Sequence, residues 1–121
     1  MKKILVAEDD KFLGNAYRVK LSKSGFEVKL ATDGDEALKA LESFTPDLIL
    51  LDLVMPVRDG FSTLEEIKSK DEFKHVPVII ASNLGQKEDI EKGLKLGAKD
   101  FFIKSDMSLE NLIAKIKSYL G

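Results

Sequence analysis

The sequence predicts a doubly wound α/β fold, a parallel sheet of five strands in the order 2-1-3-4-5 with helices on both faces. Short apolar runs alternate with amphipathic stretches along the whole chain, which is typical of strand–helix units in a parallel sheet. Glycine, proline or aspartate separates these segments, so the connections are short. The 121 residues are enough for one domain with a substantial core, and we expect that domain to span residues 1–121.

The first two strand–helix units are expected in the N-terminal third of the chain. An apolar strand over Lys3–Ala7 precedes a helix over Lys11–Lys23, which Gly25 ends because glycine adopts the left-handed conformation readily. The apolar face of this helix contains Leu13, Tyr17 and Leu21, with Phe12, Ala16 and Val19 beside them. A second strand over Glu27–Ala31 leads to a helix over Gly34–Ser43.

The remaining three units follow the same alternation. Strands are expected at Leu48–Asp52, Pro77–Ala81 and Lys99–Ile103. Helices are expected at Phe61–Ser69, Gln86–Leu96 and Leu109–Leu120. The middle strand of this group is nearly all apolar, which is typical of a strand covered on both faces. Apolar residues recur three and four positions apart in the helices, most clearly in the last one.

Composition excludes several classes of protein. The net charge is −2, from 19 basic and 21 acidic residues, so the chain lacks the basic patch of a nucleic-acid-binding protein. It contains no cysteine, which excludes disulfides and thiolate metal sites. The apolar run near the N-terminus is too short for a signal peptide or a membrane span. We therefore expect a cytosolic protein without direct contact to nucleic acid or membrane.

Polar residues follow four of the predicted strands. Glu8 and Asp9 come after the first strand, Asp52 ends the third, Ser82 follows the fourth and Lys104 follows the fifth. The carboxyl ends of parallel strands meet at one edge of the sheet, where ligands of doubly wound folds bind. The acids, the hydroxyl and the lysine together suggest a site for a divalent cation and a phosphoryl group.

The carboxylates favour a metal site. Two like charges about 4 Å apart repel by roughly 4 kcal/mol at an effective dielectric constant near 20, so a cluster of three needs a cation or a proton. Oxygen ligands without imidazole or thiolate suit Mg²⁺ or Mn²⁺. For Asp10 we prefer a simpler role, capping the first helix.

The other strand-end residues suit phosphoryl chemistry. Aspartate can act as a nucleophile toward phosphorus, so Asp52 is a candidate to form an aspartyl phosphate. Lys104 is placed to pair with a phosphate oxygen, and the hydroxyl of Ser82 could donate a hydrogen bond to the same group.

These residues lie in four motifs that resemble those of response regulator receiver domains, in particular the single-domain chemotaxis regulators of two-component signalling. The motifs are ILVAEDD at 4–10, LDLVMPVRDG at 51–60, AS at 81–82 and DFFIK at 100–104. Each is weak alone, but four in this order and spacing are specific. The resemblance covers essentially the whole chain. It implies a flavodoxin-like fold and a phosphorylated signalling switch, which is not an enzyme but takes part in its own phosphorylation and dephosphorylation.

The resemblance also implies a role for each residue. Mg²⁺ would be held by Glu8, Asp9, Asp52 and the backbone carbonyl of Val54. Asp52 would accept the phosphoryl group, and Ser82 and Lys104 would contact its oxygens.

A change of conformation is implied as well. Ser82 would move toward the phosphoryl group, and Phe101, at the position of the family's aromatic switch, would turn inward behind it. A sensor histidine kinase or a histidine phosphotransfer protein would supply the phosphoryl group. A downstream effector protein or an output domain would read the altered surface.

Four positions depart from the family pattern or refine it. The family usually has proline after the lysine, joined by a cis peptide bond, whereas this chain has Ser105. A cis bond before a non-proline residue costs about 3–4 kcal/mol, so we expect Lys104–Ser105 to be trans. Phe101 replaces the commoner tyrosine. Val54 and Leu84, which flank the site, offer no hydrogen bond to an attacking water, and we expect a long-lived phosphorylated form.

Other classes of protein fit the residues less well. A phosphatase of the haloacid-dehalogenase type needs a second aspartate where this chain has Val54. A flavodoxin-like electron carrier would bind phosphate in a loop after the first strand, where Glu8 and Asp9 would repel it. The main alternative is a pseudo-receiver, which binds partners without being phosphorylated.

Overall fold

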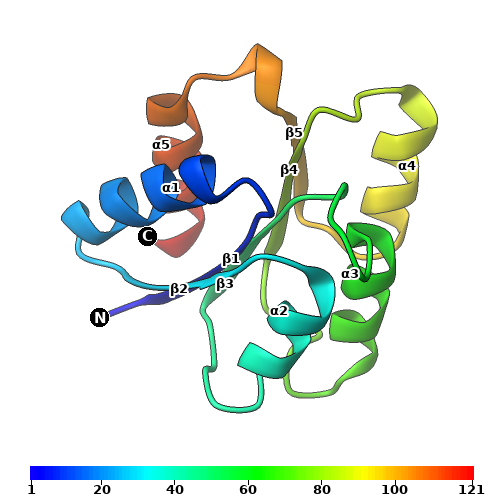
Figure 1. Ribbon diagram of the computed structural model, residues 1–121, viewed down its shortest axis with the longest axis horizontal. Helices are drawn as coiled ribbons and strands as arrows, with labels where there is room; N and C mark the ends of the chain where they lie inside the picture. Colours follow the sequence, from blue (N-terminus) through cyan, green and yellow to red (C-terminus); the bar gives the residue numbers. More distant parts are fainter.

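The computed structural model describes residues 1–121 and shows one parallel five-stranded sheet between two layers of helices (Figure 1). The strands are β1 (Lys3–Ala7), β2 (Glu27–Ala31), β3 (Leu48–Leu51), β4 (Val78–Ser82) and β5 (Asp100–Ile103). The helices are α1 (Lys11–Lys23), α2 (Gly34–Ala40), α3 (Gly60–Ser69), α4 (Lys87–Lys95), the 3₁₀ helix η1 (Lys104–Asp106) and α5 (Leu109–Leu120). The strand order β2-β1-β3-β4-β5 confirms the predicted doubly wound fold. None of the helices has the length and apolarity needed to cross a bilayer.

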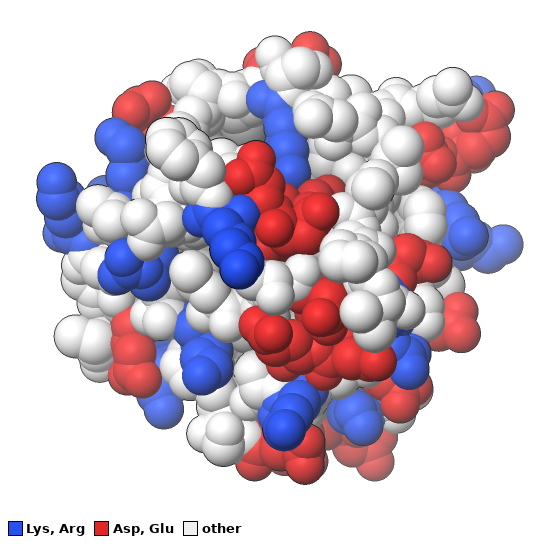
Figure 2. Space-filling model, viewed as in Figure 1, with Lys and Arg blue, Asp and Glu red and all other residues white.

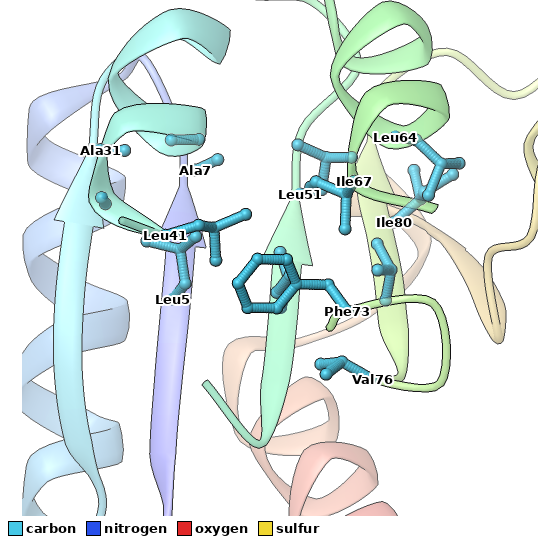
Figure 3. Packing of buried hydrophobic residues seen from close by; sticks show 14 of the residues in the cluster. Leu5, Ala7, Ala31, Leu41, Leu51, Leu64, Ile67, Phe73, Val76 and Ile80 are labelled. Atoms are coloured by element: carbon cyan, nitrogen blue, oxygen red, sulfur yellow. The ribbon is translucent and has the colours of Figure 1, made fainter. Parts of the chain in front are cut away.

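The sheet separates two hydrophobic cores. Figure 1 shows α1 and α5 on one face and α2, α3 and α4 on the other. Side chains alternate along each strand, so Leu5 and Ala7 of β1 belong to the core on the α2–α4 face, whereas Ile4 and Val6 belong to the core under α1 and α5. Figure 3 shows part of the first core, where the ring of Phe73 points toward the sheet. Both faces of the central strands are thereby kept from water.

Local interactions explain where α1 begins and where α1 and α4 end. The carboxylate of Asp10 accepts hydrogen bonds from the backbone N–H groups of Phe12 and Leu13, which confirms its role as the N-cap of α1. Gly25 and Gly97, which follow α1 and α4, have φ angles of 94° and 113°, in the left-handed region that glycine favours.

One expectation for α1 is wrong. Phe12 is 89% exposed and Val19 is 36% exposed, although we placed both beside the apolar face. At about 100° per residue, Phe12 lies about 140° around the helix from Tyr17, which is buried. The buried face is therefore narrower than the sequence suggested, and it is completed by Gly14 and Leu21.

Some element boundaries also differ from the sequence expectation. We expected the second helix to reach Ser43, but α2 ends at Ala40, and the N–H of Ser43 bonds the carbonyl of Ala40 in a tight turn. β4 begins at Val78 rather than Pro77, because proline has no N–H to donate to the ladder. The helix η1 was not predicted.

Candidate functional site

The ladder between β1 and β3 brings the first carboxylates together. Ala7 and Leu51 are paired across these strands, and the N–H of Asp52 donates to the carbonyl of Ala7 at 2.9 Å. Glu8 and Asp52, the next residues of the two strands, therefore emerge side by side at the carboxyl edge. Figure 2 shows acidic side chains gathered on this face of the molecule, with basic side chains beside them.

Lys104 joins the two buried carboxylates. Its Nζ lies 2.6 Å from Oε1 of Glu8 and 3.1 Å from Oδ2 of Asp52. The side chains of Glu8, Asp52 and Lys104 are only 3%, 6% and 17% exposed, so both ion pairs are largely shielded from water. The sequence predicted that Lys104 would lie opposite Asp52, and its contact with Glu8 is an addition.

A third carboxylate completes the group. One carboxylate oxygen from each of Glu8, Asp9 and Asp52 lies within 4.8 Å of the others, and Asp9 is exposed. We call these three residues the acidic group. Three oxygen donors this close, open to solvent on one side, fit a hard divalent cation such as Mg²⁺ or Mn²⁺. With a single ammonium against three carboxylates, the group keeps the negative charge that attracts such an ion.

Burial sets the protonation of Glu8. It raises the pKa of Glu8 to about 7; the charge of Asp52 acts in the same direction, and the hydrogen bond from Lys104 opposes it. Burial also disfavours the Lys104 ammonium, but its pairing with Glu8 and Asp52 outweighs burial and raises the pKa of Lys104 above its usual value. The lysine therefore stays charged, and Glu8 is the group that titrates near neutrality.

Ser82 and Phe101 lie on the neighbouring strands. Ser82 ends β4, is fully buried, and its Oγ accepts a hydrogen bond from the N–H of Leu84 at 3.3 Å. Phe101 in β5 is half-buried against the core on the α2–α4 face. The N–H of Val54 donates to Oδ1 of Asp52 at 3.4 Å, while the Val54 side chain is 57% exposed. All the strand-end residues named from the sequence thus lie at one edge.

Comparison with known proteins identifies the family. The family model of the response regulator receiver domain matches residues 4–117. The chain belongs to the response regulator receiver domains. A relative of this receiver domain, the probable transcriptional regulator ycf27 of Cyanophora paradoxa, is 37% identical over 119 residues, which are 98% of this chain and 48% of the relative. The chain spans about half the length of the curated relatives it matches.

Solved structures agree with this membership. The receiver domain of Francisella response regulator 1452 has a TM-score of 0.88 and 34% identity, over 98% of this chain and 95% of that one. The Mn²⁺-bound form of response regulator Rcp1 has a TM-score of 0.84 and 29% identity, over 98% of this chain and 91% of that one. A structural neighbour of this receiver domain is thus known with a divalent cation bound.

The departure from the family pattern after Lys104 has the expected geometry. The chain contains no cis peptide bond, so Lys104–Ser105 is trans, as predicted. The backbone continues from β5 directly into η1, which begins at Lys104.

The sequence did not reveal how Gly60 positions the loop that follows Asp52. A Cβ at Gly60 would lie 2.3 Å from the carbonyl oxygen of Asp52 and 2.5 Å from Cα of Leu53. Only glycine therefore lets the start of α3 pack against this loop. The N–H of Gly60 donates to the carbonyl of Leu53 at 2.8 Å. The Asp59-Gly60 pair indicated a turn in the sequence, but not this close approach.

Val57 in the same loop has a backbone conformation that is rare for a β-branched residue. Its φ angle is 69°, and the N–H of Arg58 bonds the carbonyl of Pro56 at 2.7 Å across it, which makes a tight three-residue turn. Val57 is 77% exposed, so no packing explains the choice of valine. Strain of this kind is concentrated at functional loops in other proteins.

Proposed function

We propose that this receiver domain accepts a phosphoryl group on Asp52 from a phosphohistidine of a sensor kinase or phosphotransfer protein, in a Mg²⁺-dependent reaction. The observation that carries the proposal is the placement of Asp52 between a buried ammonium, 3.1 Å away, and two further carboxylates. A structural aspartate has no need of this arrangement. The whole chain, residues 1–121, would act as one phosphoacceptor domain.

The residues of the chain suggest how the transfer proceeds. An Oδ atom of Asp52 forms a bond to phosphorus while the P–N bond of the phosphohistidine breaks, and the leaving imidazole nitrogen takes the electron pair of that bond. Lys104 is already within hydrogen-bonding distance of Asp52, so its ammonium can follow the charge onto the phosphoryl oxygens. Released from Asp52, it would keep its second partner, Glu8.

A divalent cation would be held by Glu8, Asp9, Asp52 and the carbonyl of Val54. When bound, it supplies positive charge that neutralises the phosphoryl oxygens. Glu8 would have to be ionised for this binding, and the cation would compete with Lys104 for the carboxylates of Glu8 and Asp52.

The phosphorylated form would act as a switch. Ser82 is fully buried, and its Oγ lies 3.3 Å from the backbone nitrogen of Leu84, so a move toward the phosphoryl group would pull on the loop after β4. Phe101 is half-buried, and in this proposal its ring turns further inward. The surface of α4, β5 and α5 would change and be recognised by an effector protein or output domain in the cytoplasm. The energetics are those of a population shift between two packings.

The test is labelling by a small phosphodonor. The chain is incubated with acetyl phosphate and Mg²⁺, and its intact mass is followed. We expect the mass of one added phosphoryl group, lost on chelation of Mg²⁺ and in Asp52→Asn. Asp47→Asn, at the opposite end of β3, is the matched control and should be labelled normally.

The contrary result has a clear meaning. A chain that binds Mg²⁺ but is labelled neither by acetyl phosphate nor by phosphoramidate would be a pseudo-receiver. Labelling that persists in Asp52→Asn would place the phosphoryl group on another residue and end the proposal.

A further inference from the structure

Lys104 also lines a cavity that lies outside the acidic group and has no role in the proposed phosphoryl transfer. This cavity lies between α1, α5 and the connection from β5 to α5, and its volume is about 370 Å³. Figure 1 shows α1 and α5 beside each other below that connection. Ligand pockets typically have volumes of roughly 300–1,000 Å³. The cavity is therefore large enough for one small molecule.

The walls of the cavity are mainly apolar. Seven of its eleven lining residues are hydrophobic, among them Leu13, Phe102 and Leu112. The only charged side chain is Lys104, whose ammonium is already paired with Glu8 and Asp52. An anion therefore finds no free positive charge here, and the lining favours an uncharged apolar ligand.

Tyr17 supplies a specific polar contact within these walls. The residue is 3% exposed, and its hydroxyl makes no hydrogen bond to any other group of the protein. No polar side-chain atom of the chain is both fully buried and unpaired, so the Tyr17 hydroxyl is accessible to water, and Tyr17 is one of the residues that line this cavity. Burial raises the pKa of Tyr17 to about 12, so the phenol stays protonated at neutral pH and can donate.

We propose that this cavity binds a small aromatic molecule that carries one hydrogen-bond acceptor, with the acceptor bonded to the hydroxyl of Tyr17. The apolar walls take the ring, and the accessible hydroxyl of Tyr17, which has no partner within the protein, donates to the acceptor of the ligand. Lys104 contributes to both the cavity and the acidic group, so the ligand would lie beside the phosphoacceptor site without using its carboxylates. This inference does not depend on phosphorylation of Asp52.

Two small probes of similar size test the proposal by NMR titration of the ¹⁵N-labelled chain. Acetophenone has a ring and one carbonyl acceptor, and toluene has the ring alone. We expect saturable shifts from both, centred on the amides of Leu13, Phe102 and Leu112. Tyr17→Phe should weaken acetophenone about two- to tenfold, the worth of one hydrogen bond, and leave toluene unweakened.

Two further variants serve as controls. Tyr119→Phe removes the other tyrosine hydroxyl, which donates to Asp100 outside the cavity, and should bind both probes as the wild type does. Ser105→Phe places a ring at the exposed edge of the cavity and should abolish binding of both probes. The dispersion of each spectrum shows whether the variant is folded.

Three results would overturn the proposal. The first is the absence of saturable shifts with either probe, which would leave the cavity to a side chain of a protein partner. The second is a set of shifts scattered outside the lining residues. The third is an acetophenone affinity that Tyr17→Phe does not change.

Discussion

The surroundings of Glu8 leave its charged and neutral forms close in free energy near neutral pH. Glu8 is 4% exposed, it accepts hydrogen bonds from Lys104 and from the N–H of Asp10, and it lies beside Asp52. A buried carboxylate with one cationic partner shared by two acids is close to balance between its charged and neutral forms. A divalent cation would shift that balance, so Glu8 would couple metal binding to pH.

The first prediction concerns pH and the metal-free protein. The pKa of Glu8 is about 7 in the folded chain, against 4.5 for an unperturbed glutamate, so the folded state binds more protons between these values. Glu8 therefore contributes stability that is present below about pH 4.5 and lost as the pH rises through 7, at most roughly 3 kcal/mol. In EDTA, the urea midpoint of Glu8→Gln should increase relative to the midpoint of the wild type as the pH rises. A difference between the two proteins that stays constant from pH 4.5 to 7.5 would contradict this assignment.

The second prediction concerns the lifetime of the phosphorylated form. Val54 is 57% exposed beside Asp52 and offers no side-chain hydrogen bond to an attacking water. Val54→Asn provides an amide that can orient that water, and we expect phosphoryl loss, followed by intact mass, to become severalfold faster. Val57→Asn in the same loop, at a φ angle that asparagine tolerates, is the control and should leave the rate unchanged. An unchanged rate in Val54→Asn would count against the long-lived form.

At the scale of elements, the glycine of α4 determines how closely that helix approaches the sheet. A Cβ at Gly93 would lie 2.7 Å from Cδ1 of Ile80 and 3.2 Å from Cδ2 of Phe101. Gly93 is the only buried residue of α4, so this contact fixes the helix against β4 and β5. The helix that covers the proposed switch residue Phe101 thus depends on the absence of one methyl group.

The third prediction compares two glycine-to-alanine substitutions in helices. Gly93→Ala should destabilise the protein by about 1–3 kcal/mol, because the overpacked contact outweighs the better helix propensity of alanine. Gly14→Ala in α1 meets no atom closer than 3.9 Å and should stabilise by about 0.5–1 kcal/mol. Urea denaturation of both variants measures the difference. Equal effects of the two substitutions would show that α4 yields to the added methyl group.

The sequence predicted four elements to the residue and the others within a few positions. β1, α1, β2 and α5 have the predicted ends because turn glycines, a capping aspartate and clear periodicity define them. The end of α2 and the helix η1 were not predictable, since both depend on how the chain turns across the finished sheet. The exposure of Phe12 was missed because a broad apolar stretch does not reveal how narrow the contact with the sheet is.

The site was more predictable than the boundaries. Parallel strands place their carboxyl ends at one edge, so strand assignment alone brought Glu8, Asp52 and Lys104 together. The ion pair of Lys104 with Glu8 and the close approach of Gly60 to the loop could not be predicted from the sequence. Both contacts depend on how the finished fold places atoms to within a few tenths of an ångström.

At the scale of the whole molecule, the two cores share the same strands. Leu50 of β3 faces the core under α1 and α5, and Leu51 faces the core on the other side. Loss of packing on one face would expose the strands to water, and the core on the other face packs against the same strands. We therefore expect the chain to unfold in a single cooperative transition, as most domains of this size do.

The fourth prediction tests this coupling across the sheet. The chain has no tryptophan, and its two tyrosines, Tyr17 and Tyr119, both pack in the core under α1 and α5. Ile67→Val removes one buried methylene from α3, on the opposite face, and should cost about 0.5–1.5 kcal/mol. The urea midpoint should fall equally by tyrosine fluorescence and by far-ultraviolet circular dichroism. The exposed control Glu65→Ala in the same helix should change stability by no more than about 0.5 kcal/mol. A tyrosine midpoint that stays in place while the dichroism midpoint falls would show that the two faces unfold separately, and that a change at the α2–α4 face has no direct route through the sheet to α5.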